Sequence, residues 1–351
     1  MSRNASRQFL LLALLVLTRP ASAAETFPPP TAGATARVVV VQGENLLSAF
    51  LPDAARVETA FNRGLTNFTR TAGVATAWRG LLTTNDTVGI KVFSAPGPLC
   101  GTHAAVVAAI VRGLLAAGLP PQQIVIWDKH ADDLRAAGFF ELGTELGVRV
   151  AGAAETGYDA DSFYLPDSPV IGALVWGDLE FGKTEKDPAA GKKSFVAKLV
   201  SRQMTKIISV APLINENAAG VCGHLFSLGL GSVDNTRRFE ANGGERLARA
   251  LPEIDALPVI GDRVVLHVTD ALLGQSEGGP AGFLQFSTVV NQLWFSRDPV
   301  ALDVLALREL ERESKAAGRL SPHANREIFS TAALLQLGVN EPEKIAVETV
   351  R

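Results

Sequence analysis

Short apolar runs alternate along this chain with longer stretches in which apolar residues recur every three or four positions. A short uninterrupted apolar run is typical of a strand buried on both faces, and the longer periodicity is typical of an amphipathic helix. The predicted strands are Arg37–Gln42, Val88–Phe93, Ile124–Trp127, Val148–Val150, Lys206–Val210, Arg263–Val268, Asn291–Phe295 and Lys344–Val350. We therefore expect an α/β fold with a layered, mostly parallel sheet flanked by helices.

The stretch from Thr87 to His130 is the most regular of these units. Its first strand stops at a loop rich in proline and glycine, because a helix or central strand tolerates neither residue well. A helix capped by Thr102 and ended by Gly118 follows, and a second apolar strand then stops at Asp128. This order predicts a βαβ unit.

Polar residues follow several of the predicted strands. Lys91, Asp128, Asp270 and Glu277 all lie at or just beyond such strand ends. Parallel strands end at one edge of a sheet, where open α/β proteins usually bind ligands. We expect these side chains to line one crevice, with the lysine contacting an anion and the carboxylates serving as acid, base or ligands of a divalent metal. A structural alternative stays open for Asp128 and Glu277, as a helix cap and a turn residue, and His267 is interpreted as a core histidine.

Two further loops each carry one cysteine and one histidine. Cys100 and His103 precede one predicted helix, and Cys222 and His224 lie in a polar loop after the strand Lys206–Val210. A disulfide between the cysteines is the simplest use in an exported protein. The same four side chains would also make a Cys₂His₂ zinc site, and unrelated positions are the third alternative. Because the chain has two cysteines, no iron–sulfur cluster is expected.

The segment from about residue 152 to residue 191 breaks the regular pattern. It is rich in glycine, aspartate and proline, carries scattered aromatic residues and has little periodicity. We expect an irregular insertion at the edge of the sheet. Apart from this insertion, residues 36–351 are expected to form a single α/β domain. A division of this domain into two lobes is the alternative.

The first residues have the layout of a cleavable secretory signal. Arg3 and Arg7 precede an apolar core at 9–17, and the small residues Ala21-Ser22-Ala23 follow it. The apolar core is too short to span a bilayer comfortably, and no later stretch is long and apolar enough to do so. We expect a periplasmic or secreted protein, with a signal peptide at 1–23, a flexible lead at 24–35 and no membrane span after cleavage.

The charge balance is nearly neutral. The chain has 33 basic and 36 acidic residues, and removing the three arginines of the signal segment changes the net charge from −3 to −6. This balance gives no support to nucleic-acid binding. The expected partner is a small molecule bound in the strand-end crevice.

Several motifs, taken together, resemble a known family. They are GLPPQQIVIWD, VTDALLGQSEGGPAG, SRDPVALDVLAL and LLQLGVNEPEKIAV, within about Val88 to Val347. In this order they look like the uncharacterised domain-of-unknown-function 362 family. The resemblance implies an α/β fold, and some members carry ferredoxin-type cluster domains whose cysteines this chain lacks. Where members resemble Lys-Pro-Asn and Lys-Thr-His, this chain has Lys91-Val92-Phe93 and Asn215-Glu216-Asn217, so only Lys91 carries over.

No nucleophile elbow, phosphate loop or dinucleotide fingerprint is present in the sequence. The leading hypothesis is an exported enzyme that acts on a small, anionic molecule in the strand-end crevice, with or without a divalent metal. The alternative is a non-catalytic periplasmic ligand-binding or assembly protein. The replacement of the basic loop at 215–217 favours this alternative.

Cleavage of the signal is the first testable prediction. The charged, apolar and small-residue layout predicts that the exported protein begins at Ala24. Sequencing the N-terminus of protein recovered from the periplasm or the medium would measure this directly. An intact Met1 on that protein would contradict it.

Overall fold

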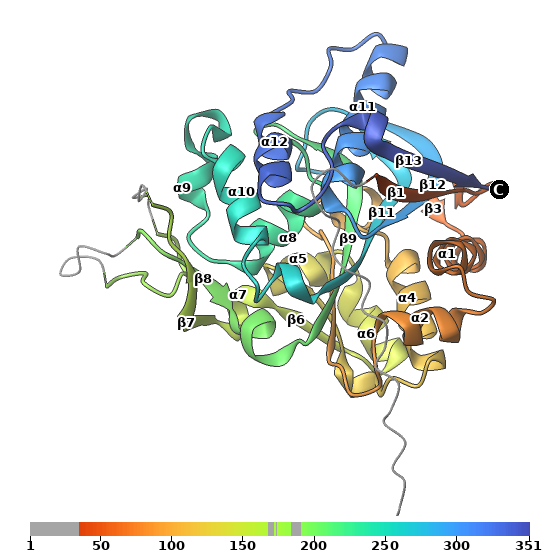
Figure 1. Cartoon of the computed structure of the whole chain (residues 1–351), viewed down its shortest axis with the longest axis horizontal. Coiled ribbons are helices and arrows are strands. Elements are labelled where there is room, and N and C mark those ends of the chain that lie inside the picture. The colour runs from red at the N-terminus through yellow and green to blue at the C-terminus, as the bar shows by residue number, and fades with distance from the viewer. Residues whose placement is uncertain (1–34, 168–171, 173, 184–190) are drawn as a thin grey trace, which may run out of the picture.

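The computed structural model describes residues 35–167, 172, 174–183 and 191–351. The predicted signal peptide, the lead as far as residue 34 and parts of the predicted insertion lie outside these ranges. The centre of the fold is a nine-stranded sheet in the order β13-β1-β12-β11-β9-β4-β5-β6, with β10 paired to β9 (Figure 1). The α/β fold predicted from the sequence is confirmed.

Apart from the two-residue β10, which was not predicted, the strands of the central sheet coincide with the predicted apolar runs; several are longer and β4 is shorter. They are β1 (Ala36–Gln42), β4 (Val88–Lys91), β5 (Ile124–Asp128), β6 (Arg149–Gly152), β9 (Lys206–Glu216), β10 (Gly220–Val221), β11 (Val264–Gln275), β12 (Ser287–Ser296) and β13 (Ile345–Val350). The pairs β4–β5, β5–β6, β4–β9, β9–β11 and β1–β13 are parallel. Strand β12 runs antiparallel to both of its neighbours, β11 and β1. The sheet is therefore mixed but mostly parallel.

Helices cover both faces of this sheet, as Figure 1 shows. Those longer than one turn are α1 (Ala54–Thr69), α2 (Val74–Leu81), α4 (Ala104–Ala116), α5 (Ala131–Ala136), α6 (Phe139–Leu146), α8 (His224–Ser232), α10 (Leu247–Asp255), α11 (Pro299–Ala316) and α12 (Glu327–Leu334). Single turns form α3 (Gly97–Cys100), α7 (Ala153–Thr156) and α9 (Arg237–Glu240), and Leu199–Gln203 is a π-helical turn. Within these ranges, no helix combines the length and the apolar character that a bilayer crossing requires.

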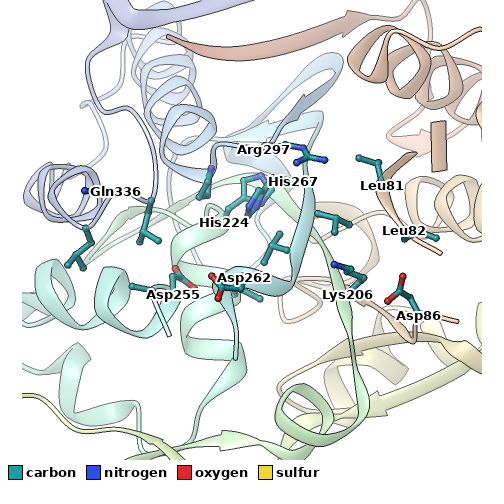
Figure 2. Close-up of a pocket in the computed structure, with 18 of the residues that line it drawn as sticks. Leu81, Leu82, Asp86, Lys206, His224, Asp255, Asp262, His267, Arg297 and Gln336 are labelled. Atoms are coloured by element: carbon teal, nitrogen blue, oxygen red, sulfur yellow. The ribbon is translucent and has the colours of Figure 1, made fainter. Parts of the chain in front are cut away.

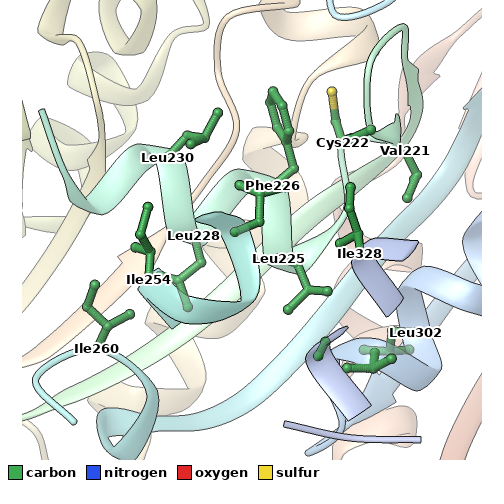
Figure 3. Close-up of a cluster of buried hydrophobic side chains, with 14 of the residues drawn as sticks. Val221, Cys222, Leu225, Phe226, Leu228, Leu230, Ile254, Ile260, Leu302 and Ile328 are labelled. Atoms are coloured by element: carbon green, nitrogen blue, oxygen red, sulfur yellow. The ribbon is translucent and has the colours of Figure 1, made fainter. Parts of the chain in front are cut away.

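The two-residue period of the strands divides the core into two layers. Ile90, Ile126 and Ile208 face one side and pack with α1, α2, α4 and α6. Val125 and Ile207, one position away from these, face the other side and pack with α8, α10, α11 and α12. Figure 3 shows this second layer, where leucines of α8 lie among side chains of α10, α11 and α12. Both faces of the sheet are therefore covered, as parallel sheets require.

Two local predictions were wrong. The segment after Cys222 was predicted to be a polar loop, but His224–Ser232 forms the helix α8, whose nine residues are all buried. Strand β11 was predicted to end at Asp270, but it continues to Gln275. His224 and Asp270 suggested exposed positions because their side chains are polar. Inside the protein, however, His224 contacts Ser209 and Asp270 contacts His103.

The predicted insertion has more order than its composition suggested. Tyr158–Tyr164 forms β7, which pairs antiparallel with β8 (Ser194–Ala197) in a separate two-stranded sheet. A second small sheet joins β2 (Leu47–Ser48) and β3 (Leu51–Pro52) near the start of the chain. Neither is part of the central sheet.

Helix α1 approaches the sheet closely at Gly64, and this contact gives a testable prediction. A Cβ atom at Gly64 would lie 2.1 Å from Cε2 of Phe295, a fully buried ring. Alanine normally stabilises a helix interior relative to glycine, by up to about 1 kcal/mol. At this position overpacking should prevail, so Gly64→Ala should lower the free energy of unfolding by about 1–3 kcal/mol in denaturant titration.

Gly80, in α2, is the matched control for this substitution. A Cβ atom there would meet no atom within 4 Å. Gly80→Ala should therefore leave stability unchanged or raise it by up to about 1 kcal/mol. Equal effects of the two substitutions would contradict the packing described here.

Candidate functional site

The structure brings two of the predicted site residues, Lys91 and Asp128, into direct contact. Lys91 Nζ donates hydrogen bonds to Asp128 Oδ1 at 2.8 Å, to Ser227 Oγ at 3.1 Å and to the Val92 carbonyl at 2.6 Å. Asp128 Oδ2 accepts from the backbone amide of Ser94 at 2.7 Å and from its hydroxyl at 2.6 Å. The lysine side chain is completely buried. This ion pair is fully satisfied within the fold.

The electrostatics of Asp128 agree with a structural ion pair. Burial alone would raise the pKa of a carboxyl group, but the charge and hydrogen bond of Lys91, with those of Ser94, outweigh it. The net result is a pKa below the ordinary aspartate value. Asp128 is therefore an anion at neutral pH, and its hydrogen bonds are directed to protein groups.

Asp270 lies on the other face of the sheet. Its Oδ2 atom accepts from the backbone amide of His103 at 2.8 Å and lies 2.9 Å from His103 Nδ1. Burial lowers the pKa of His103, but the charge and hydrogen bond of Asp270 outweigh this effect, so the net pKa is raised. His103 precedes α4, whereas Lys91 contacts Ser227 of α8. Since α4 and α8 cover opposite faces, the predicted crevice shared by Lys91 and Asp270 is wrong.

Glu277 does not join either group. It lies in the loop that follows β11 and is exposed to solvent. The crevice predicted from four strand ends therefore resolves into a buried ion pair, a buried histidine–aspartate pair and a separate surface carboxylate. Strand ends share an edge in a parallel sheet, but their side chains alternate between its two faces.

The two cysteines do not form the predicted disulfide. Both are free and buried. Cys100 Sγ lies 3.9 Å from Ser287 Oγ, and Cys222 Sγ donates to the Asn215 carbonyl at 3.7 Å. Burial raises the pKa of each thiol, and for Cys222 the charges of nearby carboxylates raise it further. Each cysteine therefore packs as an uncharged side chain.

The predicted Cys₂His₂ zinc site is also not assembled. His103 is bonded to Asp270, and both ring nitrogens of His224 face hydroxyl groups. Across the part of the chain that the structure describes, no group of three or more histidine, cysteine, aspartate or glutamate side chains could hold a metal ion.

A pocket of about 670 Å³ opens at the opposite edge of the sheet (Figure 2). It is formed where the parallel strands begin: Asp86 precedes β4, Lys206 starts β9 and Val264 starts β11. Arg297 also reaches it, because β12 is antiparallel to β11 and therefore ends at this edge. The remaining wall comes from α2, α8, the end of α10 with the turn after it, the start of α11 and the segment after α12.

His224 forms part of the pocket wall. Its Nδ1 atom lies 2.9 Å from Ser209 Oγ and its Nε2 atom 3.1 Å from Thr269 Oγ1. Its ring packs edge-on against that of His267, with centroids 4.8 Å apart. Burial, together with the proximity of His267, moves the pKa of His224 well below the ordinary value. The imidazole is therefore neutral and held in one orientation by two hydroxyl groups.

Two other buried groups in the pocket have atoms without a hydrogen-bond partner among the described residues. These atoms are both carboxyl oxygens of Asp255 and the Nδ1 atom of His267. Each side chain is 5% exposed. Burial and the nearby charge of Asp303 raise the pKa of Asp255 well above its ordinary value, and burial lowers the pKa of His267 to about 3. Burial thus favours the uncharged form of each group.

Sequence reasoning missed this pocket and misjudged one of its members. His267 was predicted to be a satisfied core histidine, but its Nδ1 atom has no partner there. The signal that could have identified it is a polar residue inside a continuous apolar strand. Asp255 ends a predicted helix, where an acidic residue attracts no notice. Lys206 and Arg297 flank strands at the edge opposite the one where α/β proteins usually bind ligands.

Comparison with known proteins adds little. No family model matches the sequence, and no curated protein matches it. A crystal structure of a protein from Thermotoga maritima is 11% identical, with a TM-score of 0.35, over 78% of this chain and 60% of that protein. The chain thus spans less than two thirds of that protein's length. A likeness this distant assigns neither a family nor an activity.

A double-mutant cycle on the buried ion pair is the prediction from this site. Removing either charge leaves the other buried without its partner, so Lys91→Met and Asp128→Asn should each cost about 3–5 kcal/mol of unfolding free energy. The double variant should cost less than the sum of the two, with a coupling energy of about 1–3 kcal/mol. Denaturant titration of the four proteins measures these values.

The exposed pair of Lys344 and Glu341 provides the matched control. Lys344→Met should change stability by less than about 1 kcal/mol, because solvent screens that pair. If Lys91→Met were as mild as Lys344→Met, the ion pair would not have the structural role assigned to it.

Proposed function

We propose that this protein binds a small organic molecule in the pocket at the sheet edge where β4, β9 and β11 begin. The observation that carries the proposal is the pocket itself, about 670 Å³ in volume and lined by side chains from several elements of the fold.

The size and composition of the pocket support the same proposal. A volume of about 670 Å³ lies within the range of ligand pockets, roughly 300–1,000 Å³. Apolar side chains such as Leu82, Leu228 and Val265 line much of it, with a few polar groups among them. Such lining is characteristic of sites that enclose a small molecule and fix its orientation with few hydrogen bonds.

Catalysis in this pocket is the second candidate function. Two of the buried groups that line it, Asp255 and His267, are titratable, and burial raises the pKa of the first and lowers that of the second to about 3. Neither group has a hydrogen-bond partner among the described residues that would orient it for proton transfer, whereas the apolar lining supports binding directly. We therefore place ligand binding first and acid–base catalysis second.

Two further proposals, export and a family resemblance, come from the sequence alone. We infer export from the layout of residues 1–23, so the ligand would be met in the periplasm or outside the cell. Similarity to the domain-of-unknown-function 362 family is proposed on the motifs quoted above. Neither proposal depends on the pocket, and the pocket does not depend on them.

A pocket-filling variant tests the proposed function. Ala256 lines the pocket and is half-buried, so a tryptophan there would occupy the cavity without replacing a core side chain. The purified protein would be screened by melting temperature against amides, alcohols, sugars, carboxylic acids, phosphate esters and amines. A ligand at a hundred times its dissociation constant stabilises a protein by about 2.7 kcal/mol. Ala256→Trp should abolish that stabilisation.

The control is Ala55→Trp, on an exposed position of α1 outside the pocket. This variant should respond to ligands as the original protein does. Stabilising ligands that act equally on both tryptophan variants would place their binding elsewhere and contradict the proposal. A screen in which no compound class stabilises the protein would contradict it as well.

A further inference from the structure

Strand β13 forms one margin of the central sheet (Figure 1). It pairs with β1 in a regular parallel register that runs from Ile345 opposite Ala36 to Val350 opposite Val41. Among the described residues, β1 is its one strand partner. Alternate backbone N–H and C=O groups of such an edge strand point away from the sheet, where they can pair with a further strand.

The side chains of β13 leave this margin open. The four residues 346–349 are all exposed, and successive side chains of a strand point to opposite faces of the sheet. The opposite margin differs, because β6 is four residues long and has Arg149 as its one exposed residue. Of the two margins, that of β13 is therefore the longer and the less covered.

The features that usually prevent an edge strand from pairing are weak in β13. Natural edge strands avoid pairing by means of proline, β-bulges or charged side chains, lysine above all. Strand β13 has no proline, its register with β1 has no bulge, and its one charged residue is Glu348. Arg37 of β1 donates to both carboxylate oxygens of Glu348, at 2.9 and 2.6 Å. The neighbouring strand therefore already neutralises this charge.

The sequence of β13 suits pairing with a second copy of this chain. When a two-fold axis perpendicular to the sheet relates two antiparallel strands, the residue on the axis lies opposite its own equivalent. With Val347 on the axis, two valines that are each 47% exposed meet at the centre. Ala346 then lies opposite Glu348, and Ile345 lies opposite Thr349. The central contact is apolar, and no like charges face each other.

The charges that flank β13 complement each other in the same register. Exposed Glu343, in the short helical turn before the strand, lies opposite exposed Arg351, directly after it. The two-fold axis repeats this pair, so opposite charges meet at both ends of the paired strands. An axis through Glu348 would instead place two carboxylates opposite each other, which is destabilising.

From the open edge and this self-complementarity we infer that two copies of the chain associate through β13, antiparallel and centred on Val347, so that one sheet continues through both. Six residues a side are fewer than the roughly 20–30 of a standard stable interface, so the association is weak and depends on concentration. No residue of β13 lines the pocket, so this contact goes beyond the proposed function and does not depend on it.

A cysteine at the proposed axis tests the pairing directly. Directly opposite residues of antiparallel strands have Cα atoms about 4.5–5.5 Å apart, a distance that a disulfide can span. Val347→Cys should therefore give a disulfide-linked dimer under mild oxidation, measured by electrophoresis without reductant. The native Cys100 and Cys222 are buried and should not contribute.

Thr349→Cys is the matched control, because Thr349 is exposed on the same face of the same strand. In the proposed register, each copy of residue 349 lies opposite Ile345 of the other chain. The Cα atoms of the two introduced cysteines are then about 13 Å apart along the strands. A disulfide needs less than about 7 Å, so this variant should stay unlinked.

A charge at the axis should weaken the dimer. Sedimentation of the unaltered protein between about 1 μM and 1 mM should show a monomer that becomes a dimer as concentration rises. Val347→Lys removes the apolar contact and places two ammonium groups opposite each other, so it should raise the dissociation constant at least about threefold. Leu320→Lys changes a side chain that is 93% exposed outside β13 and should leave the constant unchanged.

Three outcomes would overturn the inference. The first is a protein that stays monomeric up to about 1 mM. The second is association that Val347→Lys and Leu320→Lys affect equally, which would place the contact elsewhere. The third is equal disulfide linkage of Val347→Cys and Thr349→Cys, which would indicate random collision and no defined register. If Val347→Lys does not fold, the comparison of the two cysteine variants still decides the inference.

Discussion

The nine residues of α8 are all buried, so the amide groups at the start of this helix have no access to water. Asp303 of α11 accepts hydrogen bonds from two of them, His224 at 2.7 Å and Leu225 at 3.0 Å. Burial raises the pKa of Asp303 to about 7 in spite of these bonds. The rest of this face depends on the contact, because α8 presents His224 to the pocket and Ser227 to Lys91. One capped helix thus links the two edges of the sheet.

The two edges differ in how their charges are satisfied. At the edge where β4 and β5 end, Lys91 and Asp128 bond to each other and to neighbouring protein groups. At the edge where β4, β9 and β11 begin, Asp255 and His267 keep atoms without partners in the described structure. At the first edge, the ion pair of Lys91 and Asp128 offsets the cost of burying their charges. At the second edge, burial favours the uncharged forms of Asp255 and His267. The edge that sequence reasoning favoured is therefore the one whose charged groups are paired within the fold.

The sequence was a good guide to the sheet, because continuous apolar runs such as Ile124–Trp127 have few alternatives to a buried strand. It was a poor guide to α8, since serine, glycine and histidine suggest a loop unless their buried partners are known. The candidate site failed for a related reason. Strand ends can be ordered along an edge from sequence, but the face on which Asp270 finds His103 depends on long-range packing. Arg297 reaches the pocket because β12 is antiparallel to β11, and apolar patterns do not distinguish an antiparallel strand from a parallel one.

The pocket groups reduce the stability of the fold, and this bears on their role. A core selected for stability alone would place apolar side chains where Asp255 and His267 lie, since a buried polar atom without a partner costs about 1–3 kcal/mol. The neighbouring His224 shows that the fold can satisfy an imidazole in this region, with Ser209 and Thr269 on its two nitrogens. The chain therefore provides partners for one histidine and leaves Nδ1 of the adjacent one, His267, without a partner among the described residues.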